Sequence, residues 1–330
     1  MWTKTITKLL AISLLTLVSA CSKELPQRDT TITPCAAAPE GRAGAAYAAL
    51  GNDVYILFGR SEKHDVTSTI LRYNAAQDTW TTLTTPLTAR VHPTALALDG
   101  AIYVGLGYAA KGIYSEDSYL RDFYRYEPVT DTWTQLADYP SGKTVAAISF
   151  SDGQYIYAGF GFRGFTHELF RYDPAADKWQ EMSTTLKASD FPPRAMSPVA
   201  ATVGGRHFVG TGFRNHVSSF WAEYFPASDS WAERTATPGK NRHNAACTAT
   251  DSQIFVFGGW HYGDSLTTGF HYEDILCYTP ADDAWSSFGT MPDGPSENRV
   301  AARIKNTIYF GLGEDKDGKL LTNFYRFEVQ

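Results

Sequence analysis

The sequence predicts an all-β fold, a propeller of six blades with four antiparallel strands each, and three recurring patterns carry this prediction. Tyr and Trp recur seven residues apart, with Asp two residues before each Trp, at Tyr73–Trp80, Tyr126–Trp133, Tyr172–Trp179, Tyr224–Trp231 and Tyr278–Trp285. A strand-like segment ends in glycine at Gly59, Gly107, Gly161, Gly212, Gly259 and Gly313, with a period of about 51 residues. A two-residue turn that tolerates positive φ precedes most of these segments. A period near 50 residues with four short strands indicates a propeller blade.

Within one repeat, the elements follow each other in a fixed order. A first strand of small residues begins after a basic residue: Arg42, Arg90, Lys143, Arg194, Arg242 or Arg299. A turn such as Asp99-Gly100 leads to the second strand, which ends in the glycine. The third strand ends near the repeated Tyr, a turn such as Asp173–Asp177 follows, and a fourth strand opens on Trp.

The last repeat lacks its fourth strand, because the chain stops after Phe324–Val329 without a further Trp. An unpaired outer strand edge is a liability that proteins avoid. Residues 29–36 belong to no repeat and have β-type composition. We therefore predict that this N-terminal segment supplies the outer strand of the last blade and closes the ring.

These features resemble the kelch repeat over residues 40–330: an Arg-led first strand, a glycine pair after the second, Tyr in the third and Trp opening the fourth. Gly-x-Gly replaces the usual pair in four repeats, and Gly258-Gly259 alone keeps it. The variant is similar to envelope kelch proteins of Bacteroidetes-type bacteria and, more distantly, to N-acetylneuraminate epimerases. The resemblance implies the fold but little about activity, because propellers carry many functions.

Residues 1–20 are predicted to be a lipoprotein signal peptide, and residues 21–28 a lipidated cysteine with a polar tether. Lys4 and Lys8 precede an apolar run, Leu9–Val18, that is too short to span a bilayer. The segment ending at Cys21 resembles a bacterial lipobox, in which Cys21 carries the lipid, and Ser22 favours outer-membrane sorting. An ordinary signal peptide that ends near a cysteine is the alternative. The expected location is the cell envelope, with residues 29–330 forming the propeller and the lipid as its only membrane attachment.

The amino-acid composition and net charge limit the classes of partner that we expect. The chain has 330 residues, 43% hydrophobic and 14% aromatic, with a net charge of −6, so it can fill a large core and offers no basic field for nucleic acid. Cys21, Cys35, Cys247 and Cys277 show no metal-binding spacing, and we expect no structural disulfide, no metal and no cofactor. A monomeric propeller is expected.

The residues that carry binding chemistry are predicted to converge at one end of the ring. In an antiparallel blade, the loop after the second strand and the link into the first strand open on the same face. The predicted binding residues are Arg42, Arg60, Arg90, His92, Tyr108, Arg163, Arg194, Arg214, Arg242, His243, Trp260, His261, Tyr262 and Arg299. They would form a cationic, aromatic-rich face for a glycan or a protein. The alternative is that the first-strand arginines only bridge neighbouring blades.

We expect a lipid-anchored binding protein rather than an enzyme, because common catalytic motifs are absent. Copper oxidases on kelch scaffolds are similar in fold only, since neither Cys247 nor Cys277 falls on the predicted face. One alternative is a scaffold subunit of an envelope complex, in which the long loops of repeats two and five grip a partner. A second is a sialic acid mutarotase-like isomerase, with Glu314 or Asp315 beside Arg299 and Arg42 as weak catalytic candidates.

Overall fold

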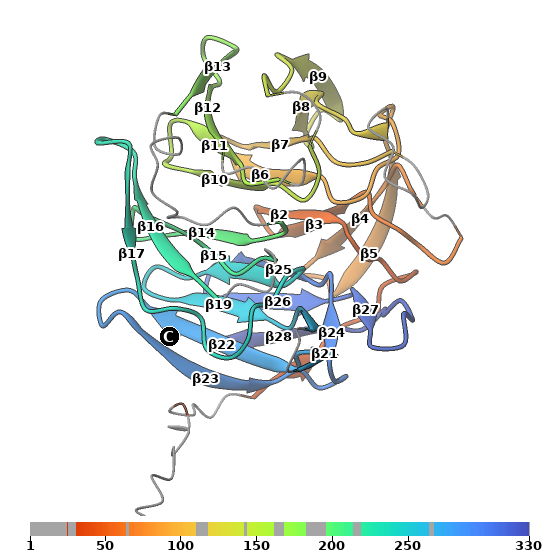
Figure 1. Ribbon diagram of the computed structural model, residues 1–330. Helices are drawn as coiled ribbons and strands as arrows, with labels where there is room; N and C mark the ends of the chain where they lie inside the picture. The colour runs from red at the N-terminus through yellow and green to blue at the C-terminus, as the bar shows by residue number, and fades with distance from the viewer. Residues whose placement is uncertain are drawn as a thin grey trace, which may run out of the picture.

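The computed structural model describes residues 25, 31–63, 66–109, 118–141, 144–161, 168–182, 196–213, 219–263 and 267–329. In this part of the chain the regular elements are strands, and they form six sheets of four antiparallel strands arranged in a ring (Figure 1). The predicted all-β, six-bladed propeller is therefore confirmed. Among the described residues no helix has the length and apolar character needed to cross a bilayer.

The first three blades follow the chain order from the inner to the outer strand. Blade 1 contains β2 (Ala46–Leu50), β3 (Asp53–Leu57), β4 (Thr69–Asn74) and β5 (Thr79–Thr84). Blade 2 contains β6 (Thr94–Leu98), β7 (Ala101–Gly105), β8 (Phe123–Glu127) and β9 (Thr132–Leu136). Blade 3 contains β10 (Ile148–Ser151), β11 (Ile156–Gly159), β12 (Leu169–Asp173) and β13 (Lys178–Glu181).

The last three blades repeat this order, with two additions. Blade 4 contains β14 (Val199–Val203), β15 (Arg206–Gly210), β16 (Trp221–Phe225) and β17 (Ser230–Glu233). Blade 5 contains β18 (Ala246–Ala249), β19 (Ile254–Phe257), β22 (Asp274–Thr279) and β23 (Ala284–Thr290), and its second loop forms a hairpin of β20 (Trp260–Gly263) and β21 (Thr268–His271). Blade 6 contains β25 (Val300–Ile304), β26 (Thr307–Gly311) and β28 (Phe324–Glu328), and a short ladder pairs β24 (Ser296–Glu297) with β27 (Glu314–Asp315).

The N-terminal segment supplies the outer strand of blade 6, as predicted. Strand β1 (Thr33–Pro34) pairs antiparallel with β28, so that Thr33 lies opposite Arg326. Beyond the ladder, the Cys35 amide donates to the Phe324 carbonyl over 2.8 Å. The edge of the last blade is thus covered by the beginning of the propeller chain, and the first and last blades become neighbours.

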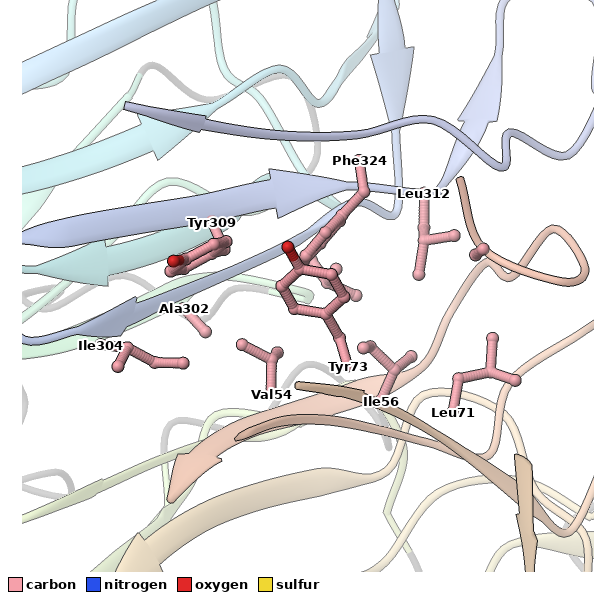
Figure 2. Close-up of a cluster of buried hydrophobic side chains, with 11 residues drawn as sticks. Val54, Ile56, Leu71, Tyr73, Ala302, Ile304, Tyr309, Leu312 and Phe324 are labelled. Atoms are coloured by element: carbon pink, nitrogen blue, oxygen red, sulfur yellow. The ribbon is translucent and has the colours of Figure 1, made fainter. Parts of the chain in front are cut away.

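Among the described residues, a large apolar cluster lies between each pair of adjacent blades, and two smaller clusters lie near blades 2 and 3. Figure 2 shows the cluster that closes the ring, in which Val54, Ile56 and Tyr73 of blade 1 face Tyr309 and Phe324 of blade 6. Each blade packs both of its faces against its neighbours, which explains why most second strands, such as Ile254–Phe257, are almost continuous apolar runs.

The Tyr–Asp–Trp repeat is a clasp that holds one blade to the preceding one. In blade 5, Asp283 accepts hydrogen bonds from the Tyr278 hydroxyl (2.6 Å) and from the Thr235 amide of blade 4 (2.9 Å), while the Trp285 indole donates to the Thr235 carbonyl (2.8 Å). Asp177 and Trp179 hold Ala137 of blade 2 in the same way, and Asp78 and Trp80 hold Ala36. Ala36 follows β1, so the N-terminal strand is clasped like any other outer strand.

The Gly-x-Gly departure has a conformational explanation. The residue before the terminal glycine has positive φ in all six blades: Phe58, Leu106, Phe160, Thr211, Gly258 and Leu312. Glycine adopts this conformation without strain, whereas a side chain costs about 1 kcal/mol there. The five non-glycine side chains are all buried. Burying the four large apolar ones, Phe58, Leu106, Phe160 and Leu312, offsets the strain.

Candidate functional site

A channel runs through the centre of the ring and is lined by the first strands of all six blades. Its volume is about 490 Å³, which falls within the usual range for small-molecule sites. Tyr47 crosses part of it, because its hydroxyl donates to the Cys247 carbonyl and accepts from the Cys247 amide. At one end the lining includes His92, Asn244 and Asn298.

That end is the face on which the predicted residues were expected. In five blades, the residue after the terminal glycine forms a backbone bridge to a residue just ahead of the first strand: Ala43–Arg60, Val91–Tyr108, Met196–Phe213, His243–Trp260 and Glu297–Glu314. We call this end the mouth and define it by His92, Asn244, Asn298, Glu297 and Glu314.

The predicted arginines divide into buried and exposed ones, and the buried ones are a correction. Arg42, Arg90, Arg242 and Arg299 are each at most 2% exposed. Three of them donate to the carbonyl before the terminal glycine, namely Arg42 to Phe58, Arg90 to Leu106 and Arg242 to Gly258. Their carboxylate partners are Glu40, Asp122 and Asp274, and Arg299 pairs with Asp293. These four guanidinium groups therefore fasten the blade corners, and we leave them out of the site.

Arg299 also departs from its expected place in the repeat. The Gly259 amide donates to the Ser296 carbonyl, just as the Gly59 amide donates to the Arg90 carbonyl of the next blade. Ser296 thus occupies the arginine position of blade 6. Arg299 lies three residues later and bonds back to the Ser296 hydroxyl (2.5 Å).

Two of the predicted binding residues, Arg60 and His92, lie together at the mouth with the catalytic candidate Glu314. Arg60, with 41% of its side chain exposed, pairs with the Glu314 carboxylate at 2.5 Å. Asn298 donates to the other Glu314 oxygen at 2.8 Å. His92 lies close enough to both charged groups for them to affect its pKa, which burial and Arg60 lower to about 4. His92 is therefore neutral at pH 7.

Glu297 is the central residue that the sequence did not reveal. It lies opposite Glu314 in the β24–β27 ladder, is 9% exposed, and accepts a hydrogen bond from Asn244 at 2.7 Å. His271 lies 3.4 Å from its other oxygen. Burial, together with the nearby Glu314 charge, raises the pKa of Glu297. Its ionisable contact is the His271 ring, whereas the arginine at the described mouth, Arg60, is paired with Glu314.

Aromatic rings form one side of the mouth, and we call Phe213, His243, Trp260 and Tyr262 the aromatic wall. Trp260 lies 5.0 Å from His243 and 5.2 Å from Tyr262, and Phe213 of blade 4 contacts both His243 and Tyr262. Tyr262 is 56% exposed, whereas His243 is 3% exposed and its Nδ1 has no hydrogen-bond partner among the described residues. The His271 ring stacks on Trp260 at 5.7 Å and links the wall to Glu297.

The remaining predicted residues lie elsewhere or outside the described part of the chain. Tyr108 is buried against Tyr119, and His261 is buried with its Nδ1 on Asn241. Asp315 accepts from the amides of Asp317 and Lys319 and so shapes its own turn, which holds the pKa of Asp315 below its usual value. Cys21, Arg163, Arg194 and Arg214 lie outside the described residues. Within the described ranges, no group of His, Cys, Asp and Glu is placed to hold a metal ion.

Comparisons with known proteins agree with this fold. Residues 241–292, which span most of blade 5, match the family model described as Kelch motif. Kelch-like protein 25 of Xenopus tropicalis is 24% identical over 82% of this chain and 45% of its own length. Kelch-like protein terF of Aspergillus terreus is 26% identical over 84% of this chain and 62% of its own length. The chain thus spans less than two thirds of these relatives.

A solved structure shares this fold. The structure of YjhT aligns with a TM-score of 0.71 and 15% identity over 88% of this chain and 95% of that one, which shows a shared fold. The chain therefore carries a kelch motif within a six-bladed propeller.

Proposed function

We propose that this protein is a lipid-anchored propeller of the cell envelope that binds a ligand, a glycan or a segment of a partner protein, at the mouth of its channel. The observation that carries the binding proposal is the aromatic wall beside a hydrogen-bonded carboxylate–amide network, at the opening of a cavity of about 490 Å³. Concave sites of this kind, with apolar rings and a few fixed polar groups, are typical of ligand binding.

The aromatic wall is also poorly explained by stability alone. Tyr262 and Phe270 of the β20–β21 hairpin are 56% and 38% exposed, so their rings contribute little to the core. Exposed aromatic side chains on a fixed hairpin can anchor a ligand at low entropic cost. This exposure also favours the second candidate, a scaffold subunit that grips a partner through blade 5.

The test is a binding screen with envelope glycans and envelope protein extracts, repeated on Trp260→Ala and Tyr262→Ala. Both variants should lose most of the binding while keeping the melting temperature nearly unchanged. Phe225→Ala is the matched control, because Phe225 is an exposed aromatic residue at the last position of β16, at the opposite end of the strands. Equal binding by Tyr262→Ala and the parent protein would refute the mouth as the binding site.

The lipid anchor is supported by the sequence of residues 1–21. Cys21→Ser should release the protein from membrane fractions into the soluble fraction, because a single residue would carry the lipid. Unchanged membrane association would show that a partner holds the protein there.

The isomerase alternative receives no support from the predicted geometry. It needed Glu314 or Asp315 beside Arg299 and Arg42, but these two guanidinium groups are buried against Asp293 and Glu40. Glu314 faces Arg60 instead.

A further inference from the structure

The hydrogen-bond directions at the mouth leave two amide oxygens without a partner among the described residues. A carboxylate can only accept, so Asn244 must turn its Nδ2 toward Glu297, and Asn298 must turn its Nδ2 toward Glu314. Each amide therefore presents its Oδ1 on the other side, and neither oxygen has a partner among the described residues. The described mouth thus offers two amide oxygens and two carboxylates, while its strongest donor, Arg60, is already engaged by Glu314.

The carboxylates at the mouth outnumber its arginines and lysines. Among the described residues, two carboxylates face one guanidinium group, and His92 and His243 are neutral at pH 7 because burial lowers the pKa of each to about 4. Glu297 is 9% exposed, and its ionisable contact is the His271 ring rather than an arginine or a lysine. Burying a carboxylate that lacks a permanent cation beside it is costly, and burial and the Glu314 charge raise the pKa of Glu297. A ligand that carries a positive charge would reduce this cost.

The aromatic wall also favours a positively charged ligand. The faces of Trp and Tyr rings attract cations, most strongly where water is excluded. Trp260 stands next to Tyr262, and the His271 ring that stacks on Trp260 reaches the Glu297 carboxylate. A cationic group at the mouth would have the rings of the aromatic wall on one side and the carboxylate and amide oxygens of Glu297, Glu314, Asn244 and Asn298 on the other.

We propose that the mouth binds a positively charged nitrogen group, a primary ammonium or a guanidinium, carried by the ligand. This rests on the proposed function, since it assigns the ligand chemistry of the same site. It differs in sign from the cationic face that the sequence suggested, because four of the predicted arginines, Arg42, Arg90, Arg242 and Arg299, are buried and paired. Two sources present this chemistry: a free amino sugar, and a Lys or Arg side chain of a protein.

The experiment compares matched probes by isothermal titration calorimetry on the full chain. D-glucosamine is compared with D-glucose for the sugar source, and Nα-acetylarginine amide with Nα-acetylcitrulline amide for the side-chain source. N-acetylneuraminic acid serves as the anionic probe. The cationic member of at least one pair should bind at least tenfold more tightly than its neutral match, and the pair that shows this preference identifies the source.

Variants assign the preference to the mouth. Glu297→Gln keeps the shape of the side chain and removes its charge, so it should reduce the preference about tenfold. Glu314→Gln is the second variant, in case the first folds poorly. Asp251→Asn, in the turn between β18 and β19 at the opposite end of the strands, makes the same change in net charge and should leave the preference intact.

Three results would overturn the inference. One is equal or tighter binding of D-glucose, citrulline amide or N-acetylneuraminic acid. If that binding is lost in Trp260→Ala, the proposed function stands and only the charge assignment fails. Another is a cationic preference that survives both carboxylate variants, which would place the site elsewhere. The third is no binding by either cationic probe.

Discussion

The clasp between blades 4 and 5 can be broken at a single oxygen atom. Asp283→Ala removes the acceptor for the Tyr278 hydroxyl and for the Thr235 amide. Hydrogen bonds to a charged group contribute about 1.5–3 kcal/mol each, and a buried donor left without a partner adds to the loss. Asp283 also has a φ of 47°, which Asp tolerates better than Ala by about 1 kcal/mol. Allowing for overlap between these contributions, we expect a loss of about 3–5 kcal/mol in the free energy of unfolding.

The pH dependence of this loss follows from the pKa of Asp283. Burial alone would raise it, but the hydrogen bonds from Tyr278 and Thr235 and the charge of Arg234 hold it below the usual 3.8. A depressed carboxyl pKa contributes stability that is present above pH 3.8 and is lost as the pH falls through the folded-state pKa. The difference between Asp283→Ala and the parent protein should therefore be largest near pH 7 and shrink in acid.

The assay is urea denaturation followed by tryptophan fluorescence, with two controls. Asp283→Asn retains an acceptor oxygen and tolerates positive φ, so it should lose less than half as much as the alanine variant. Asp282→Ala changes the charge of an exposed neighbouring residue and should stay within about 0.5 kcal/mol of the parent protein. If Asp283→Ala costs no more than Asp282→Ala, the repeated Asp does not hold the blades together and the clasp argument fails.

Two further predictions concern the closure of the ring by the N-terminal strand and the stability of the protein at low pH. Removing residues 1–39 deletes β1 and Ala36, leaves the β28 edge unpaired and should lower the melting temperature by several degrees; a truncated protein that melts with the full chain would contradict the N-terminal closure. His92 and His243 protonate in the unfolded chain near pH 6.5 but in the folded protein only near pH 4, so stability should fall as the pH drops through this window by about 1.4 kcal/mol per pH unit for each histidine. His243→Phe should remove about half of that slope in denaturation measured at pH 5 and pH 6, and an unchanged slope would show that His243 is not buried as a neutral group.

The fold could be predicted from the sequence because the repeated residues have structural roles that recur. The repeated Asp has positive φ before the outer strand in blades 1 to 5. In blades 1, 3 and 5 this Asp accepts two hydrogen bonds and the Trp indole donates to the preceding blade, so the Tyr–Asp–Trp spacing reports the blade architecture. The missing last Trp strand likewise predicted the role of β1, because an open edge has to be covered.

The burial of the arginines was harder to predict. It depends on carboxylate partners from other parts of the fold, and the sequence alone does not show which carboxylate pairs with which arginine. Arg90 and Arg242 each sit 32 residues before the Asp that neutralises them, Asp122 and Asp274, so two repeats did contain that signal. Blade 6 does not show this Arg–Asp spacing, because Ser296 occupies the arginine position and Arg299, three residues later, bonds to the Ser296 hydroxyl. A basic residue at the start of a first strand is therefore not evidence for an exposed cationic side chain.

The mouth arises from departures from the repeat, which is why repeat matching could not find it. Positions 297 and 314 correspond to Ala43 and Arg60 in blade 1 and to His243 and Trp260 in blade 5, and their backbones are bridged in the same way. In blade 6 alone among these pairs both positions are acidic. The scaffold fixes where such side chains meet, and their identity is free to vary because neither takes part in the clasp. Residues at bridged positions that differ between blades are thus the ones from which the ligand chemistry of this propeller should be inferred, and here they indicate acceptors beside aromatic rings.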